Sequence, residues 1–440
     1  MKTTPAVFAS LALLTAASAA PLRAADKATP AKNSIDQKQI EVALIPEKET
    51  ILPGEPIFVT FVVRNKTGQE LGVYLGDGFY YDSPINPGSY FNFKITDADG
   101  KKVPVIQGHG PGISVSSDPV LCKFSKEGEY QTPLFLPVWV KLDKPGVYTI
   151  TVTKTVSISR LIAGEKLPFF DDEKALMTKD MTATAMVKVL PDNPQQMGEL
   201  IDALGAKAVA DASGTVLKQE DKDMNEQDRE RGGLKADYAL GKVRKLAEIH
   251  DERTIPWLQR LAIESADYSA RRTALETLAK NDSDAAFNAL KAALETPADK
   301  IGTGVQPWGD PKTPAPSVAE AFRAEVIWAI CLSKNPAAVE FGLTFRHDPD
   351  LAVRRWVETM ALLRLKPEEA LPVLLEFEKD SNESIREEAK PGLYRACEQL
   401  KPGVAIPVLR DLAKDKNQQL AADAKQELAE KLDEEAKKKN

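Results

Sequence analysis

Cysteine is scarce in this sequence of 440 residues, which contains only Cys122, Cys331 and Cys397. An exported protein that relied on disulfides would usually carry a denser, even-numbered set. The three thiols are therefore predicted to be buried and unpaired, where they pack as small apolar side chains. A bridge between Cys331 and Cys397 is disfavoured because these residues fall in non-adjacent units of the repeat described below.

Histidine is equally scarce, and His109, His250 and His347 are isolated from one another in the sequence. No Cys-x-x-Cys occurs either, whereas zinc sites need such groups at short spacing. The chain also lacks a glycine-rich phosphate motif and a nucleophile elbow. These absences predict a protein that is not an enzyme and that carries no cofactor and no metal.

Strongly basic stretches do not stand out, and the formal net charge is −7. Nucleic-acid binding needs clustered Lys and Arg to neutralise phosphates, so nucleic acid is not expected as a partner. The hydrophobic fraction of 43% is ordinary for a globular chain and allows a sizeable core.

Apolar runs long enough to span a bilayer are missing as well. The first residues are Met1-Lys2, followed by an apolar run from Ala6 to Ala17 and a small-x-small site at Ala17-Ser18-Ala19. This pattern is typical of a secretory signal peptide, and the run is shorter than the ~20 residues of a membrane span. We expect cleavage within 19–25, a disordered segment over 26–35, and a periplasmic or secreted protein without membrane insertion.

The N-terminal half shows short β-type runs separated by turn residues such as Pro53-Gly54 and Asp97–Gly100. Several such runs in succession predict an antiparallel β-sandwich or barrel. The expected strands are Ile40–Ile45, Ile57–Val63, Tyr90–Ile95, Lys102–Ile106, Leu134–Val140, Val147–Val152 and Thr184–Leu190.

One segment of this half resembles immunoglobulin-like domains. Leu142–Val152 carries Gly146 and Tyr148 in the Gly-x-Tyr pattern of a tyrosine corner. Two residues after the tyrosine, where antibody domains have a disulfide cysteine, this chain has Ile150. The resemblance implies an all-β, immunoglobulin-like sandwich over 36–191 without that disulfide.

An aromatic loop interrupts the β pattern around residues 76–88. Exposed aromatic rings can stack on sugars or anchor a partner, but the same rings can also cap one end of a sandwich core. A second insertion, 157–181, is either a lid over the domain junction or a long loop. The candidate loop contacts are Phe79, Tyr80, Tyr81 and Tyr90.

From Pro194 onward the β pattern stops. Leu200–Leu204 indicates a short helix, and Lys218–Gly233 a charged linker, so that 192–233 joins the two halves. A proline-led helix start then recurs, which is tolerated because the first helical N–H groups have no intrahelical partner. Its copies are Thr254–Leu258, Ala370–Leu374 and Ala405–Leu409.

A second helix also recurs, with a polar residue ahead of an apolar-Arg pair. Its copies are Asp267–Arg272, Asp350–Arg355 and Ser381–Arg386. The two patterns predict about five hairpins over 234–440, with an insertion at 296–317 and a polar capping tail. Pro391-Gly392 falls inside a second helix and is expected to kink or split it.

These hairpins resemble HEAT repeats, and the resemblance implies an all-α solenoid with a concave surface used for protein contact. Four arginines recur where the second helix begins and are predicted to form a ladder that binds a protein. In the alternative interpretation, each of them pairs with an acidic residue of the adjacent hairpin. The four are Arg271, Arg354, Arg355 and Arg386.

The sequence thus predicts a multi-domain protein, an immunoglobulin-like β-sandwich followed by a HEAT-like solenoid. Its expected role is that of a non-catalytic periplasmic or secreted adaptor that binds a protein partner through the solenoid. The alternative is a glycan-binding or glycan-active accessory module that uses the aromatic loop residues.

Overall fold

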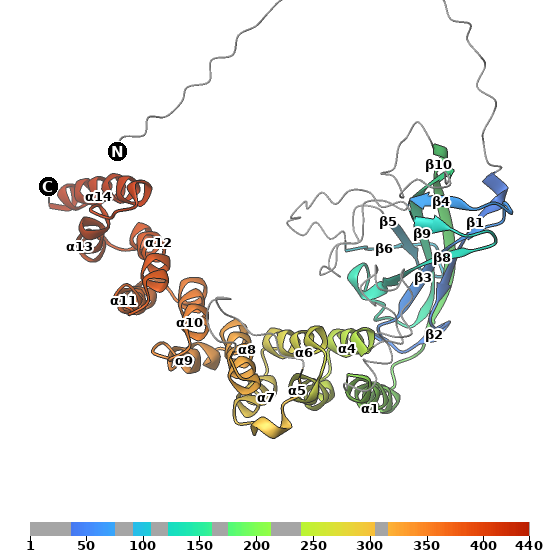
Figure 1. The fold of residues 1–440 in the computed structure, drawn as a ribbon, viewed down its shortest axis with the longest axis horizontal. Coiled ribbons are helices and arrows are strands. Elements are labelled where there is room, and N and C mark those ends of the chain that lie inside the picture. Colours follow the sequence, from blue (N-terminus) through green and yellow to red (C-terminus); the bar gives the residue numbers. More distant parts are fainter. Residues whose placement is uncertain are drawn as a thin grey trace, which may run out of the picture.

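The computed structural model describes residues 37–74, 91–106, 122–160, 175–212, 239–303 and 316–439. A β-rich region comes first and a curved stack of helices follows it (Figure 1). The predicted signal peptide, the segment 26–35 and the charged linker 218–233 lie outside the described residues. Among the residues described, no helix is both long and apolar enough to cross a membrane.

The β-rich region begins with a sheet of three antiparallel strands in the order β1-β3-β8. Its central strand is almost entirely buried, as its run of β-branched and aromatic residues predicts. A short 3-10 helix, η1 (Gln37–Gln39), precedes the sheet. The strands are β1 (Ile40–Pro46), β3 (Phe58–Asn65) and β8 (Glu129–Phe135).

A second sheet is built around the long antiparallel pair β9 (Gly146–Arg160) and β10 (Ala175–Val189). The strands β4 and β5 both pair with the side of β9 away from β10, and β2 pairs with β10 in parallel. Further short strands extend the sheet at β4 and β5. The short strands are β2 (Thr50–Ile51), β4 (Leu71–Tyr74), β5 (Phe91–Thr96), β6 (Lys102–Val103) and β7 (Cys122–Phe124).

The core of this region lies between the two sheets. The ring of Phe61 on β3 meets the ring of Phe91 on β5 edge to face, with centroids 5.6 Å apart. Ile150 and Val152 on β9 are fully buried in the same apolar cluster. Each such side chain contributes roughly 1.5–3 kcal/mol through burial, so the facing sheets account for the stability of this region.

Three strand predictions differ from the structure, and the first is Lys102–Ile106, of which only Lys102–Val103 is strand. The run Leu134–Val140 is strand only to Phe135 and continues as the 3-10 helix η2 (Leu136–Val138), because Pro137 cannot donate to a ladder. The insertion 157–181 is partly strand, since β9 and β10 both extend into it. Cross-strand hydroxyl pairs such as Thr153 with Thr182 (2.9 Å) line their outer face.

The helical region consists of α1 and α4 followed by five hairpins within the described residues. The first two helices are α1 (Pro194–Asp211) and α4 (Ala239–Glu248). The hairpins are α5 (Ile255–Glu264) with α6 (Tyr268–Lys280), α7 (Asp284–Leu294) with α8 (Val318–Leu332), α9 (Ala337–Leu343) with α10 (Leu351–Arg364), α11 (Pro367–Phe377) with α12 (Glu383–Gln399), and α13 (Pro402–Leu412) with α14 (Gln418–Lys439). The short 3-10 helices η4 (Glu252–Thr254) and η5 (Ala298–Lys300) lie between them.

The hairpins stack into an arc, with their first helices on the outer side and their second helices on the inner side (Figure 1). Consecutive second helices contact each other, from α4 and α6 through α12 and α14. Polar caps start them: the side chains of Asp267, Asp350 and Asn382 accept hydrogen bonds from N–H groups of the first turn. Side chains exposed on the second helices therefore face the inner side of the arc.

The helix expected to be short, around Leu200–Leu204, spans 18 residues as α1. Its apolar face joins the core of the first hairpins through Ile201 and Ala208, both fully buried. Gly205 lets the ring of Trp257 on α5 approach the α1 backbone. The helix is thus the first layer of the stack and not merely a connection.

The proline inside α12 does not split the helix, which runs unbroken past Pro391 to Gln399. The adjacent Gly392 lies against Leu362 of α10, where a Cβ would come within 2.3 Å of a methyl carbon. Cys331 and Cys397 are buried free thiols, as the sequence predicted, because each occupies a helix face inside the stack.

Candidate functional site

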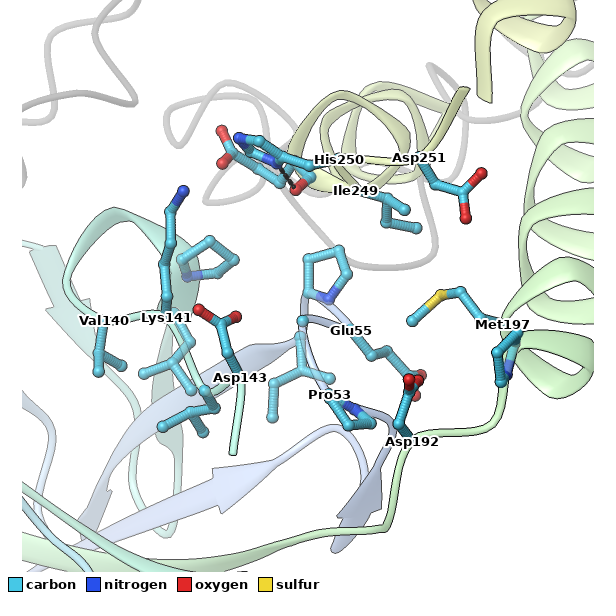
Figure 2. Close-up of a pocket in the computed structure, with 18 of the residues that line it drawn as sticks. Pro53, Glu55, Val140, Lys141, Asp143, Asp192, Met197, Ile249, His250 and Asp251 are labelled. Carbon is cyan, nitrogen blue, oxygen red and sulfur yellow. Dashed lines mark hydrogen bonds between the residues drawn. The ribbon is translucent and has the colours of Figure 1, made fainter. Parts of the chain in front are cut away.

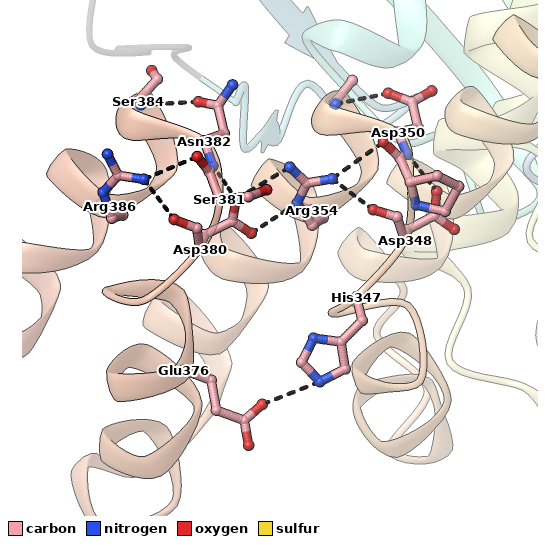
Figure 3. A network of polar contacts seen from close by, with 12 residues as sticks. His347, Asp348, Asp350, Arg354, Glu376, Asp380, Ser381, Asn382, Ser384 and Arg386 are labelled. Atoms are coloured by element: carbon pink, nitrogen blue, oxygen red, sulfur yellow. Dashed lines mark hydrogen bonds and ion pairs between the residues drawn. The ribbon is translucent and has the colours of Figure 1, made fainter.

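Among the arginines of the predicted ladder, Arg354 joins two neighbouring turns of the stack (Figure 3). Its guanidinium donates to both carboxylate oxygens of Asp380 in the next hairpin, at 2.8 and 3.2 Å. It also donates to the carbonyl of Asp348 in its own turn, at 2.7 Å. Burial raises the pKa of Asp380, but the Asn382 N–H and Arg354 outweigh it, so the pKa lies below its usual value. This arginine holds two hairpins together.

The same arrangement repeats along this edge of the solenoid. Arg323 donates to the carboxylate of Asp348, one hairpin before Arg354. Arg386 donates to the carbonyls of Asp380 and Ser381 at 2.6 and 3.0 Å, in its own turn (Figure 3). Arg323 and Arg354 thus form charged links between successive turns, whereas Arg386 contacts its own turn.

Arg271 occupies the equivalent position in the first hairpin but is completely buried. Its guanidinium donates to the carbonyls of Ala262, Ser265 and Gly302 at 2.6–2.9 Å and lies 5.0 Å from the ring centre of Phe322. Burial lowers its pKa to about 10. With no exposed surface, Arg271 presents nothing to a partner and instead ties the α5–α6 hairpin to the loop at Gly302.

Arg355 lies apart from these links, on the inner side of the arc. It donates to Ser384 and pairs with Glu388 on α12 at 3.0 Å, and 42% of its side chain is exposed. Of the predicted arginines, Arg354 and Arg386 thus meet around Asp380, whereas Arg271 and Arg355 have separate surroundings.

Aromatic and cationic side chains link consecutive second helices near Arg355. The guanidinium of Arg272 on α6 lies 4.9 Å from the ring centre of Trp328 on α8, which meets Trp356 on α10 edge to face at 6.3 Å. The Arg272 side chain is 40% exposed. We call Arg272, Trp328, Trp356 and Arg355, which belong to the second helices α6, α8 and α10, the inner-face row.

A buried carboxyl lies beside this row. Glu358 on α10 is only 2% exposed, and neither of its side-chain oxygens has a hydrogen-bond partner among the residues that the structure describes. Burial, reinforced by Glu388 and Asp380 and opposed by Arg355, raises its pKa to about 8. Glu358 is therefore protonated at neutral pH, which reduces the cost of burying it without a partner.

The β-rich region and the solenoid touch at an ion pair between Glu47 and Lys245 of α4. The Lys245 side chain is only 9% exposed, and its ammonium also lies 5.6 Å from the ring centre of Phe58. Glu47 in turn accepts a hydrogen bond from the backbone N–H of Phe58 at 3.2 Å. This contact fixes α4 against the start of β3.

A cleft of about 530 Å³ opens next to this contact, between the two regions (Figure 2). We call it the interdomain cleft. The β-rich side supplies residues 53–57 and 136–143, and the helical side supplies residues around the start of α1 and the end of α4. Its apolar lining includes Pro53, Ile57, Leu136, Met197 and Ile249.

Negative charge predominates around the cleft. Its acidic residues are Glu55, Asp143, Asp192, Glu248 and Asp251, against the cationic Lys141 and Arg253 and the imidazole of His250. Arg253 is engaged by Asp251 and by the carbonyl of Pro194. Among the described residues, no group of three or more His, Cys, Asp or Glu is placed to hold a metal ion.

The predicted aromatic loop contacts, Phe79, Tyr80, Tyr81 and Tyr90, lie outside the described residues. The sequence analysis did not predict the inner-face row, the buried Glu358 or the interdomain cleft. A signal for the row existed, because Trp328 and Trp356 each fall in a second helix. The cleft had none, since its walls come from four separate segments.

Comparison with known proteins identifies part of the helical region. Residues 239–303 match the family described as HEAT repeats, so the helical region contains HEAT repeats. No curated protein matches the sequence.

Three solved structures are similar in part. The complex of CpcE and CpcF of phycocyanin lyase from a Nostoc species has 15% identity and a TM-score of 0.22, over 44% of this chain and 73% of that chain. Human deoxyhypusine hydroxylase with glycerol has 16% identity and a TM-score of 0.20, over 54% and 97%. Alpha-2-macroglobulin from E. coli has 12% identity and a TM-score of 0.18, over 88% of this chain but 25% of that chain.

Proposed function

We propose that this protein is an exported adaptor without catalytic activity, which binds a protein partner through the inner side of its HEAT-repeat solenoid. The observation that carries the proposal is the inner-face row. It places two exposed arginines, Arg272 and Arg355, on second helices whose packed tryptophans support them, since Trp328 is itself only 8% exposed.

The chemistry of the row suits protein recognition. Tryptophan and arginine are enriched among the residues that dominate binding energy at protein interfaces. Here the rings pack edge to face and Arg272 lies against one of them, so the row is ordered before a partner arrives. Ordering in advance reduces the entropy lost on binding.

The β-rich region serves in this proposal as an immunoglobulin-like sandwich that presents or anchors the solenoid. Two facing sheets support the assignment. So does Tyr148, whose hydroxyl donates to the carbonyl of Lys144 at 2.9 Å, the upstream backbone contact of a tyrosine corner. Such folds host unrelated functions, so the partner is assigned to the solenoid and not to the sandwich.

Export is the third part of the proposal and rests on the N-terminal Met1–Ala19 pattern. Expression of the full chain in a Gram-negative host should yield a shortened protein in the periplasmic fraction. Recovery of the uncleaved chain in the cytoplasm would contradict export.

Charge reversal on the inner side tests the adaptor role. In the double variant Arg272→Glu with Arg355→Glu, capture of the partner from a cell-envelope extract should fall at least tenfold. The matched control reverses two exposed cations away from the row, Lys300→Glu with Arg410→Glu. Equal capture by both variants, with unchanged thermal unfolding, would overturn the role of the row.

A further inference from the structure

We propose that the interdomain cleft binds an extended segment of the partner protein in which lysine or arginine alternates with apolar residues. This inference rests on the proposed adaptor function and names the chemistry of the partner. It is carried by the apolar floor of the cleft, by the charge around it and by its position between the two regions.

The floor of the cleft is apolar and already ordered. Ile57, Leu136 and Ile249 are 1%, 2% and 6% exposed, so they are held in place by the cores on either side. Prolines contribute further to the walls and provide no N–H donors. A segment lying here would make its apolar contacts mainly with the more accessible lining residues Pro53, Pro194 and Met197. The prolines are Pro53, Pro56, Pro137 and Pro194.

The charge around the floor is not balanced. Glu55 pairs with Lys48, and Asp251 pairs with Arg253. In the described part of the chain, Asp143, Asp192 and Glu248 form no ion pair with a basic side chain. Their carboxylates surround an apolar surface, and a cationic side chain on a bound segment would complement them.

The size and charge of the cleft disfavour other occupants. At about 530 Å³ it falls within the ~300–1,000 Å³ typical of ligand clefts, which suits a few residues of extended chain. An anionic ligand would meet the carboxylates of Asp143 and Asp192, which form no ion pair among the described residues, and that of Glu248, which interacts electrostatically with Arg244. Lys141 is the one lining cation without a described ion pair.

An occupant would contact both regions of the protein at once. The cleft adjoins the Glu47–Lys245 pair, which already joins α4 to the β-rich region. A segment seated there would extend that contact, so binding should also stabilise the junction. The inner-face row and the cleft would then recognise different parts of one partner.

A synthetic peptide of about eight residues that alternates lysine and leucine is the probe. Its binding to the mature chain is measured by fluorescence anisotropy at low and at high salt. We expect the dissociation constant to rise about tenfold in the triple variant Asp143→Asn, Asp192→Asn, Glu248→Gln, and to rise with salt in the unmodified protein. A counterpart peptide with glutamate in place of lysine should not bind.

The control neutralises three exposed carboxylates elsewhere, Glu295→Gln, Asp299→Asn and Glu340→Gln, and should keep the original affinity. No binding of the lysine peptide, or an equal loss in both triple variants, would overturn the cleft assignment. The Arg272→Glu, Arg355→Glu variant separates the two proposals. If it still binds the peptide but loses the partner, both stand. If the variant binds both the peptide and the partner, the proposed role of the inner-face row is wrong and the cleft assignment stands.

Discussion

At the residue scale, arginines in equivalent positions have different roles because their neighbours differ. Arg354 meets the carboxylate of Asp380 across the turn, whereas Arg271 meets the carbonyl of Gly302 in the corresponding place. Arg386 meets only carbonyls of its own turn. The ladder is therefore a set of links within the solenoid whose strength varies from one hairpin to the next.

Removal of Arg271 should be far more costly than removal of Arg386. Arg271→Met leaves the buried carbonyls of Ala262, Ser265 and Gly302 without their donor, and we expect a loss of about 3 kcal/mol or more. Arg386→Met, in a partly exposed turn, should cost about 1 kcal/mol or less. Urea unfolding of the two variants measures the difference, and equal losses would contradict the distinction.

Glu358 should make stability depend on pH between about 4.5 and 8. Its pKa is about 8 in the folded chain and 4.5 as the usual value, so the folded state holds the proton more tightly. Stability is therefore greatest at low pH and is lost as pH rises from about 4.5 through 8, by up to about 1.4 kcal/mol per pH unit.

Thermal unfolding between pH 6 and pH 9 checks this dependence. Glu358→Gln should remove most of the loss of stability with rising pH, because the buried amide beside Glu388 does not ionise. Glu295→Gln, at an exposed position, is the control and should decline like the original protein. Identical pH profiles for all three proteins would show that Glu358 is not the titrating group.

At the scale of the elements, close approach between helices is set by particular glycines. Gly205 allows Trp257 to lie against α1, and Gly392 allows Leu362 to lie against α12. The contact between Gly392 and Leu362 brings α10 and α12 together one helical turn from Glu358 and Glu388.

Alanine at two helical glycines should have opposite effects. In Gly205→Ala the new Cβ would lie 2.3 Å from ring atoms of Trp257, and overpacking of this kind costs about 1–3 kcal/mol. Gly403→Ala meets nothing within 4 Å in α13 and should stabilise by about 0.5–1 kcal/mol. Melting temperatures of the two variants provide the test, and a shift of the same sign in both would contradict the packing argument.

At the scale of the whole molecule, one largely buried ion pair joins the β-rich region to the solenoid. Lys245 on α4 reaches Glu47, and Glu47 is itself fixed by the backbone of Phe58. Ile57, next to Phe58, and Glu248, on the same helix as Lys245, line the interdomain cleft.

Breaking this pair should weaken the link between the two regions. A double-mutant cycle with Lys245→Met and Glu47→Gln is expected to give a coupling free energy of about 1–3 kcal/mol, since one partner is almost fully buried. Calorimetric unfolding measures it, and the single variants should separate the transitions of the two regions. A coupling near zero would mean that other contacts hold the junction.

Much of the fold could be predicted because its determinants are local. Alternating β-branched runs specify strands such as β3, and prolines and polar caps such as Asp267 specify the beginnings of helices. The repeat of these signals predicted the hairpins. Where the prediction was incomplete, at α1 and β9, the predicted helix or strand is present but extends further than expected.

The candidate sites depended on the tertiary structure. Sequence placed Arg271 and Arg354 in equivalent positions, but only the neighbouring turn decides whether a guanidinium meets a carbonyl or a carboxylate. Glu358 is buried within the helical stack, and the interdomain cleft exists because four distant segments meet. By itself the sequence determined the elements and their repeat, since these follow from local periodicity and capping. Only the tertiary structure decided burial, pairing and the cleft, since these depend on residues far apart in the chain.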